Sequence, residues 1–381
     1  IRAADFIDFN PRLSLKKGDI ATKVAMDKLK PFTKKIPETE KAEFNGGAKF
    51  CNGDTVMARI TPCLENGKTA YVDMLDDGEI GFGSTEFIVM RAKTGISDPQ
   101  FVYYTAINPV FRNVAIKSMV GSSGRQRVQQ SVLEELELSV PDLDEQRRIG
   151  DFLARIDEKI ALNDRINDNL QQQAFSVFDN LIANAENNDY TVSDYAFLNP
   201  KRTLAKNQVA RSIDMSQLST SGAFPSGWEM KPFNGGMRFT NGDTLLARIT
   251  PCLENGKTAF IDFLDDGEVA FGSTEYIFLA PKKDTPPEML YCLARYPAFV
   301  DYAVKNMNGS SGRQRVSAET VGQYRLPLFD KHSLVLFKEV VSPMFLKMRY
   351  NSLENMRLAE LRDALLPKLM SGEIDVSAVQ L

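Results

Sequence analysis

Two copies of one octapeptide carry the polar side chains that stand out first in this chain. Gly121-Ser-Ser-Gly-Arg-Gln-Arg-Val128 returns 188 residues later as Gly309-Ser-Ser-Gly-Arg-Gln-Arg-Val316. Glycines, hydroxyls and two guanidinium groups in one loop suit the binding of phosphate. A purely structural role, in which Arg125 and Arg127 tie the loop to a neighbouring helix, fits the same residues equally well.

A longer segment is also written twice. Residues 52–70 return as residues 241–259, with nearly the same sequence. A period this long indicates duplicated domains and not a solenoid of short repeats. Within the segment, Arg59 and Lys68 flank a Thr-Pro-Cys-Leu-Glu-Asn-Gly turn, and Arg248 and Lys257 flank its copy. These four cations form a second group of candidate phosphate contacts.

Catalytic chemistry finds little support in the residue types. His332 is the only histidine, and the four cysteines have no CxxC spacing, so neither a hydrolytic triad nor a zinc site is expected. Asn66-Gly-Lys-Thr69 ends like a nucleotide-binding loop, but Pro62 stands where that loop requires glycine. We therefore expect a non-catalytic chain without a metal or cofactor of its own.

The net charge of −4 hides an uneven distribution. Residues 144–189 hold ten acidic and five basic side chains, so this stretch contributes −5 and the remainder about +1. Basic side chains gather early in each repeat, where phosphate contact and an ordinary solvated surface are both open readings. The complete set of candidate contacts is Lys28, Lys30, Lys34, Lys35, Arg59, Lys68, Arg125, Arg127, Arg211, Arg248, Lys257, Arg313 and Arg315.

Each repeat has two parts with different periodicity. Short alternating runs broken by turn residues predict a β-rich domain, with one helix at about 98–114, and a heptad pattern follows in residues 144–184 and again near the C-terminus. The expected fold is α+β, with two β-rich domains at 1–142 and 189–330. Two long helices, at 143–188 and within 331–381, would form an antiparallel coiled coil with pseudo-twofold symmetry. Pro343 is expected to kink or shorten the second helix.

Asparagines interrupt the apolar seam near the middle of both helices. They are Asn163 and Asn167 in the first helix and Asn351 and Asn355 in the second. In an antiparallel pair these layers meet and their amides can bond to one another, whereas a slipped register costs about 1–3 kcal/mol for each buried amide left unsatisfied. Exposure of these residues at a loosened mid-helix is the alternative reading.

The sequence has no apolar run near the length that spans a bilayer, and its first residues lack a charged head followed by an apolar stretch. We expect a cytoplasmic protein.

At this point the motifs resemble a known family. The run Pro141-Asp-Leu-Asp-Glu-Gln-Arg-Arg-Ile-Gly-Asp-Phe-Leu-Ala-Arg-Ile-Asp-Glu-Lys-Ile160 is similar to the start of a conserved helix in specificity subunits of type I restriction-modification systems. Leu361-Arg-Asp-Ala-Leu-Leu-Pro-Lys-Leu-Met-Ser-Gly-Glu-Ile374 resembles the end of their second conserved helix. The two octapeptides and the Gly-Asp-Thr-Val-Met-Ala-Arg-Ile-Thr strand match their target recognition domains. At Asp330-Lys-His-Ser-Leu334 the Glu-Gln pair of the first copy is lost.

The resemblance implies a division of labour. Each β-rich domain would be a target recognition domain that reads one half of a bipartite site on double-stranded DNA. The helices would set the spacing and dock two modification subunits, which bind S-adenosylmethionine and methylate adenine. Restriction subunits, using ATP and Mg²⁺, would join them. The alternative function is a tandem-domain scaffold that binds proteins and never touches DNA.

Differences between the copies indicate where bases are read. Segments that are identical in both domains cannot distinguish two different half-sites, so they are assigned to the fold and to phosphate contacts. Base readout is expected in residues 28–43 against 218–232, and in 118–120 against 307–308. Because the rest is so alike, we expect related half-sites read on opposite strands.

Overall fold

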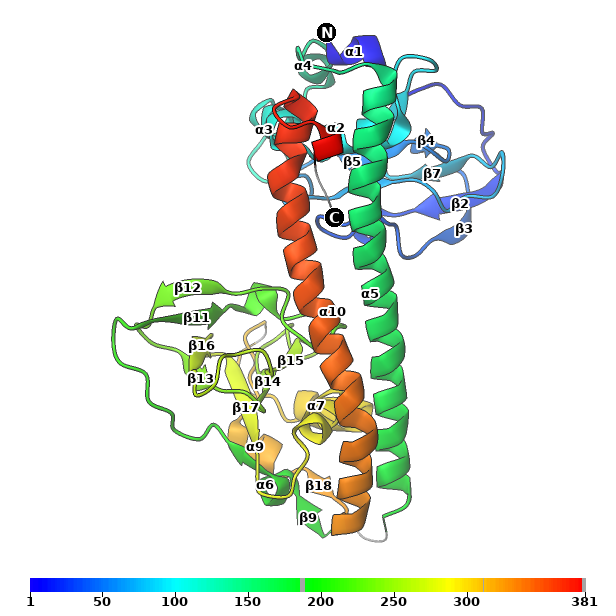
Figure 1. The fold of residues 1–381 in the computed structure, drawn as a ribbon. Helices are drawn as coiled ribbons and strands as arrows, with labels where there is room; N and C mark the ends of the chain where they lie inside the picture. Colours follow the sequence, from blue (N-terminus) through cyan, green and yellow to red (C-terminus); the bar gives the residue numbers. More distant parts are fainter. Residues whose placement is uncertain (186–188, 311, 379–381) are drawn as a thin grey trace. The chain divides into compact units, whose positions relative to one another are not determined.

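The structure, a computed structural model, describes residues 1–185, 189–310 and 312–378. Its chain divides into two compact units, formed by Ile1–Ala161 with Leu358–Leu381 and by Leu162–Arg357. Each unit contains a β-rich domain and segments of two long helices, α5 (Leu143–Ala183) and α10 (Lys331–Ser371), which are green and orange to red in Figure 1. The expected α+β fold is confirmed.

Two four-stranded sheets build the first β-rich domain. One has the antiparallel order β1-β8-β5-β6, and the other has the order β3-β2-β7-β4 with a parallel pairing between β2 and β7. Helices follow the last strand. The elements are α1 (Ala3–Phe6), β1 (Ile7–Phe9), β2 (Ile20–Val24), η1 (Met26–Lys28), β3 (Glu40–Glu43), β4 (Ala48–Phe50), β5 (Thr55–Ala58), β6 (Thr69–Tyr71), β7 (Gly81–Gly83), β8 (Phe87–Ala92), α2 (Pro99–Ile107), α3 (Pro109–Lys117) and α4 (Gln130–Glu134).

The second β-rich domain repeats both four-stranded sheets of the first. Its sheets have the orders β10-β17-β14-β15 and β12-β11-β16-β13, and the pairing of Ile7 with Ala92 returns as Ala196 with Pro281. The elements are β9 (Tyr190–Thr191), α6 (Val192–Tyr195), β10 (Ala196–Leu198), β11 (Val209–Ile213), η2 (Met215–Gln217), β12 (Glu229–Pro232), β13 (Met237–Phe239), β14 (Thr244–Ala247), β15 (Thr258–Phe260), β16 (Ala270–Gly272), β17 (Tyr276–Pro281), α7 (Pro287–Arg295), α8 (Pro297–Lys305), α9 (Ala318–Gly322) and β18 (Arg325–Leu326), with η3 (Val376–Ala378) after α10.

A glycine at the same place in both domains shows why the two sequences give one fold. Gly47 has a φ of +120°, and a Cβ there would lie 2.0 Å from the carbonyl oxygen of Gly83. Gly236 has a φ of +110°, and the corresponding distance to the Gly272 carbonyl oxygen is 2.1 Å. Only glycine permits this backbone conformation and this close approach before β4 and β13.

The helix expected at 98–114 is two helices. Asp98 caps α2 by accepting a hydrogen bond from the Phe101 amide at 3.0 Å. The helix stops at Asn108, whose side chain accepts from the Val110 amide at 2.9 Å and caps α3. Pro109 ends the first helix because it disfavours helical geometry in the preceding residue, and it suits the first turn of the second.

Segments of α5 and α10 pack against each other within each unit. In the first unit, Asp157 pairs with Arg362, their nearest atoms 2.6 Å apart. In the second unit, the rings of Phe178 and Phe337 have centroids 6.3 Å apart. Residues with higher numbers on α5 contact residues with lower numbers on α10. The two helices therefore pair antiparallel, as expected.

Both long helices contain 41 residues, so the expectation that Pro343 would shorten the second helix is wrong. Packing explains the tolerance. Val341, Phe345 and Met348 are all buried beside the proline, and this apolar contact offsets the one backbone hydrogen bond that proline cannot make.

The asparagine layers meet in the second unit. Asn163 Nδ2 donates to Asn355 Oδ1 at 2.8 Å, and Asn351 Nδ2 donates to Asn167 Oδ1 at 2.8 Å. Asn163 and Asn351 are each only 1% exposed, which excludes the loosened-helix reading for these two. The mutual satisfaction is incomplete, because the Oδ1 atoms of Asn163 and Asn351 accept no hydrogen bond from the described part of the chain.

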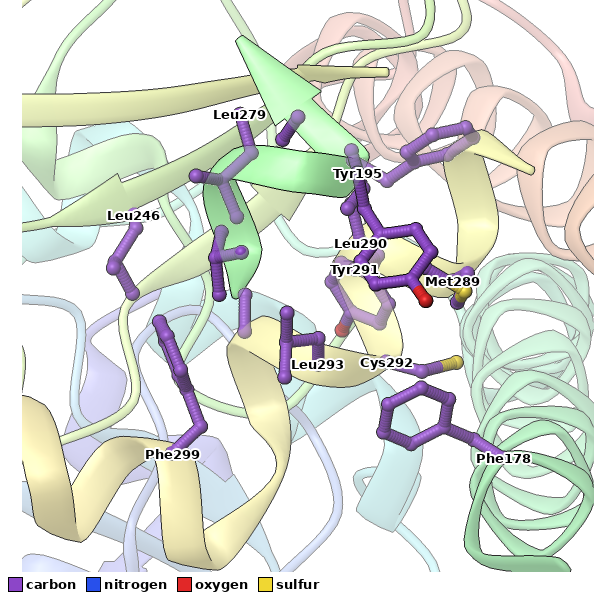
Figure 2. Packing of buried hydrophobic residues seen from close by; sticks show 14 of the residues in the cluster. Phe178, Tyr195, Leu246, Leu279, Met289, Leu290, Tyr291, Cys292, Leu293 and Phe299 are labelled. Carbon is purple, nitrogen blue, oxygen red and sulfur yellow. The ribbon is translucent and has the colours of Figure 1, made fainter. Parts of the chain in front are cut away.

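The core of the second unit gathers around α7. Met289 to Ala294 are all buried there, and Phe178 of α5 belongs to the same cluster. Figure 2 shows these side chains between the helices and the strands that carry Leu246 and Leu279. The helix segment is thus part of the domain core, which fixes the domain to the helix pair within this unit.

Across the described residues, every helix is too short or too polar to traverse a lipid bilayer.

Candidate nucleic-acid interface

An arginine–glutamate cluster holds the glycine-serine loop of the first unit. Arg127 Nε lies 3.0 and 2.9 Å from the two carboxylate oxygens of Glu86, and its Nη2 lies 2.6 Å from Oε1. This hydrogen bonding from Arg127 holds the pKa of the Glu86 carboxyl below its usual range. Arg59 adds a second cation near Glu86. The cluster therefore keeps one net positive charge from two arginines and one glutamate.

The second unit builds the same cluster from Glu275, Arg315 and Arg248. Arg315 Nε lies 3.0 and 2.9 Å from the Glu275 oxygens, and Arg248 Nε is 3.9 Å from Oε2. Hydrogen bonding from Arg315 lowers the pKa of Glu275. Arg127 and Arg315 are thus committed to internal carboxylates. The structural role foreseen for this loop is correct for them, although the partner precedes a strand and is not a helix.

The loop tips present the other arginine of each octapeptide. Val120 and Arg127 exchange backbone hydrogen bonds of 3.0 and 2.9 Å, which close the loop of residues 121–126. Arg125 and Arg313 are exposed, and neither side chain has a hydrogen bond or ion pair with the residues that the structure describes. These two guanidinium groups remain available to an external anion.

Lys68 and Lys257 have matched internal roles. Lys68 Nζ donates to the Met26 carbonyl at 2.8 Å, and Lys257 Nζ donates to the Met215 carbonyl at 2.7 Å. Each lysine therefore ties the repeated turn to the short helix η1 or η2. One ammonium hydrogen is used in each case, so their assignment as DNA contacts stays a prediction with a structural role beside it.

The assignment of Lys34 to a DNA contact is wrong, because the side chain is only 7% exposed. Its ammonium donates to the Tyr104 hydroxyl at 3.2 Å and lies 4.9 to 5.4 Å from the ring centres of three tyrosines, which are Tyr71, Tyr103 and Tyr104. Burial lowers the pKa of Lys34 to about 8. Sequence alone gave no warning, because lysine in a polar segment usually points to solvent.

The remaining candidate DNA contacts differ in whether a carboxylate of the chain pairs with their positive charge. Lys28 pairs with Glu38 and Lys35 with Asp73, while Lys30 is exposed. Arg211 lies 2.6 Å from Glu268 and 3.2 Å from Asp265, with its guanidinium 5.1 Å from the Trp228 ring centre. Arg211 is therefore a neutralised, packed side chain.

Two cationic residues on strands were not among the contacts predicted from the sequence. Lys49 on β4 and Arg238 on β13 occupy the same place in the two domains, each packed on a phenylalanine ring, Phe44 or Phe233. The signal was present in the sequence, because a cation is kept at an offset of 189 residues. Among the described residues, no cluster of three or more histidine, cysteine, aspartate or glutamate side chains could hold a metal ion.

Comparisons with known proteins agree with the family resemblance. A family model described as the type I restriction modification DNA specificity domain matches residues 32–172. The HindI specificity subunit of Haemophilus influenzae is 24% identical over 405 residues, covering 84% of this chain and 86% of that protein. The EcoAI specificity subunit of Escherichia coli is 34% identical over 134 residues, covering 35% of this chain and 21% of that protein.

A solved structure shares the fold. The type I restriction-modification S subunit of M. genitalium aligns with a TM-score of 0.53 over 97% of this chain and 95% of that chain, at 16% identity. The repeated domains, the paired helices and these matches point the same way: residues 32–172 match the type I restriction modification DNA specificity domain, and the chain over most of its length is similar to a type I restriction enzyme specificity subunit.

Proposed function

We propose that this chain is the DNA sequence-specificity subunit of a type I restriction-modification complex, in which each β-rich domain reads one half of a split DNA site. The observation that carries the proposal is a pair of domains with one strand frame and different inserted segments. The same device is present twice, and the segments suited to discrimination differ between the two copies.

Each divergent segment is hydrogen-bonded to the conserved sheet at the same position in both domains. Tyr71 donates a backbone hydrogen bond of 2.9 Å to the carbonyl of Lys34, and Phe260 donates one of 2.7 Å to the carbonyl of Ala223. Both acceptors lie in the segments 28–43 and 218–232. A fixed anchor with a variable sequence beside it suits two readers that differ in target but not in the way they sit on the duplex.

Charge supports DNA over a protein scaffold as the partner. Each arginine–glutamate cluster keeps a net positive charge, and an exposed arginine, Arg125 or Arg313, stands at each loop tip. Repeated positive charge on a chain whose net charge is −4 favours a polyanionic partner.

The chemistry belongs to partner subunits in this proposal. Two modification subunits would carry S-adenosylmethionine and methylate adenine, and restriction subunits would supply ATP- and Mg²⁺-dependent cleavage. α5 and α10 would set the spacing between the half-sites and dock the modification subunits. The HindI and EcoAI relatives are named as specificity subunits of restriction enzymes, which supports this division of labour.

The test is an adenine methylome of cells that express this gene with its neighbouring genes, compared with cells in which this gene alone is deleted. We expect a two-part motif that disappears on deletion and returns when the gene is supplied from a plasmid. A motif that survives the deletion would contradict the proposal.

A point variant tests the division between the domains. Lys30 is exposed in the divergent segment of the first domain, so Lys30→Ala should alter methylation in one half of the motif and leave the other half unchanged. The control is Lys283→Ala, an exposed lysine after β17 and outside both divergent segments. Equal relaxation of both halves would count against one reader per half-site.

A further inference from the structure

A cationic groove lies in the first unit, and two of its three cations, Arg12 and Lys49, are not among the DNA contacts predicted from the sequence. It is open, has a volume of about 560 Å³, and lies where the edge strand β4 meets the ends of β5 and β8. Arg12, Lys49 and Arg59 line it, together with the backbone at Gly47. None of the described residues that line it is an aspartate or glutamate, so the wall carries three positive charges.

The fold holds each cation in place. The side-chain oxygen of Asn10, two residues before Arg12, accepts a hydrogen bond from the Val89 backbone amide at 2.9 Å. The backbone amide of Asn10 donates to the Val89 carbonyl at 2.7 Å. Lys49 Nζ donates to the Leu13 carbonyl at 2.8 Å and lies 5.2 Å from the Phe44 ring centre. The ammonium retains further donors for a ligand.

Arg59 completes the groove from the end of β5. Its Nε is buried and has no hydrogen-bond acceptor in the described part of the chain. Glu86, the nearest carboxylate partner for its charge, is already held by Arg127 through three contacts. The positive charge of Arg59 is thus only partly compensated inside the domain.

The second unit keeps a cation at all three positions. Lys201 replaces Arg12, Arg238 replaces Lys49, and Arg248 replaces Arg59, each at an offset of 189 residues. The supports are kept as well. Asn199 makes the same two bonds to Phe278, at 2.9 and 3.0 Å, and Arg238 lies 5.6 Å from the Phe233 ring centre.

The pattern of replacement identifies the ligand chemistry. Charge is kept at every position, but arginine and lysine exchange at two of the three. Bidentate reading of a base requires the planar guanidinium, so lysine is not equivalent to arginine there. A phosphate accepts either cation, because lysine binds it as a point charge and arginine through its fork.

We infer that Arg12, Lys49 and Arg59, with Lys201, Arg238 and Arg248 in the second domain, form two equivalent seats for the phosphodiester backbone of DNA. This inference rests on the proposed function and adds a division within each domain. The seats fix the position of the duplex and supply affinity that does not depend on sequence, while the divergent segments discriminate between bases.

The experiment measures DNA binding by the assembled complex of this chain with its modification subunits, over a range of KCl concentrations. Two duplexes are used, one with the methylated motif and one with both halves of the motif scrambled. For the double variant Arg12→Gln/Lys49→Gln we expect the slope of log affinity against log salt to fall by about 2, since each lost phosphate contact removes about 0.9. Both duplexes should lose affinity by the same factor.

The matched variants separate charge from fold. Lys201→Gln/Arg238→Gln in the second unit should give the same change of slope. Lys49→Arg, which installs the residue type found in the second copy, should keep the wild-type slope. Lys283→Gln removes an exposed charge elsewhere and should leave the slope unchanged. Arg12→Gln alone alters an exposed side chain, so a slope change of about 1 cannot come from unfolding.

Three results would decide against the inference. An unchanged salt slope in both double variants would overturn it, although the reader function would stand. A loss of affinity confined to the motif-bearing duplex would show that these residues read bases. A wild-type complex that binds neither duplex at any salt concentration would overturn both the inference and the proposed function.

Discussion

The two units differ in the layer where the β-rich domain meets the helix pair. In the first unit this layer is polar: Lys34 donates to Tyr104, whose hydroxyl donates to Asp157 at 2.6 Å, and Asp157 pairs with Arg362. In the second unit, the equivalent positions hold Ala223, Cys292, Phe345 and Ala174, all buried.

The second unit fills its layer with rings. Phe345 packs against Phe260 and Tyr291, with centroid distances of 5.2 and 5.4 Å. One fold thus accepts either a charged layer or an aromatic layer between the β-rich domain and the helix pair. In each case the residues of the layer have to be compatible in charge and size. The cation positions of the groove were kept between the copies, whereas this layer was exchanged as a set.

The largest effect is expected from breaking the charged layer alone. Arg362→Ala installs the residue found at the equivalent position, Ala174, and leaves the Asp157 carboxylate, 7% exposed, without its ion-pair partner. We expect a loss of about 3 kcal/mol in the stability of the first unit. Urea unfolding followed by far-UV circular dichroism measures it.

The control for Arg362→Ala replaces both helix residues of the charged layer with the residues at the equivalent positions of the second unit. Asp157→Phe/Arg362→Ala should recover at least half of the lost stability, because the buried carboxylate is removed together with its ion-pair partner. Trp228, the only tryptophan, lies in the second unit, and its fluorescence transition should stay in place for both variants. Equal stability of the single variant and the wild type would refute the importance of the pair.

One buried aspartate has different partners in the two units. Asp54 pairs with Arg91 of β8, while the equivalent Asp243 pairs with Arg202, which follows β10. The equivalents of these arginines are Ala280 and Leu13. Arg202→Leu should destabilise the second unit by about 2 kcal/mol, less than the fully buried pair because Arg202 is partly exposed.

Relocating the cation tests whether the position of the arginine matters. Arg202→Leu/Ala280→Arg rebuilds in the second unit the pair found in the first, and we expect it to restore most of the stability that Arg202→Leu removes. Trp228 fluorescence during urea unfolding reports the result directly. A double variant as unstable as the single one would show that the two pairs are not interchangeable.

The pH dependence of the two junctions should also differ. Below pH 8 Lys34 is protonated in both the folded and the unfolded chain, so the cost of burying its charge is fully present. Between pH 8 and about 10.5 the folded chain loses this proton first, so stability rises with pH. From pH 7.5 to 9.5 the wild type should gain about 2 kcal/mol relative to Lys34→Ala, as measured by urea unfolding followed by circular dichroism. Parallel pH profiles would contradict the burial of a charged Lys34.

The smallest effect is expected in the asparagine layer of the second unit. Asn167→Leu removes the acceptor of Asn351 Nδ2 and should cost about 1 kcal/mol. Asn167→Leu/Asn351→Leu should cost less than the single change, because both members of the pair become apolar together. Strict additivity of the two single variants would argue that this pair does not set the register of the helices.

Local patterns in the sequence predicted the frame but not the partners of individual side chains. The repeat, the strands and the antiparallel helices follow from periodicities that are local to each segment. Lys34 failed as a prediction because its burial depends on Tyr104 and on α5, far away in the chain. Arg127 was left open for the same reason, since its partner Glu86 lies far away in the chain, just before β8. The 98–114 helix was predicted too long because the stop signal of Asn108 and Pro109 was overlooked.

The split layer bears on how such a gene can evolve. Asp157 lies in the first half of the gene and Arg362 in the second, and Ala174 and Phe345 are divided in the same way. A gene conversion that overwrites the second half with a copy of the first would place a second Ala174 opposite Asp157, and a buried carboxylate would lose its cation. Recombination confined to recognition-domain segments outside this layer keeps Lys34 and Tyr104 together with Asp157, so it carries no such penalty.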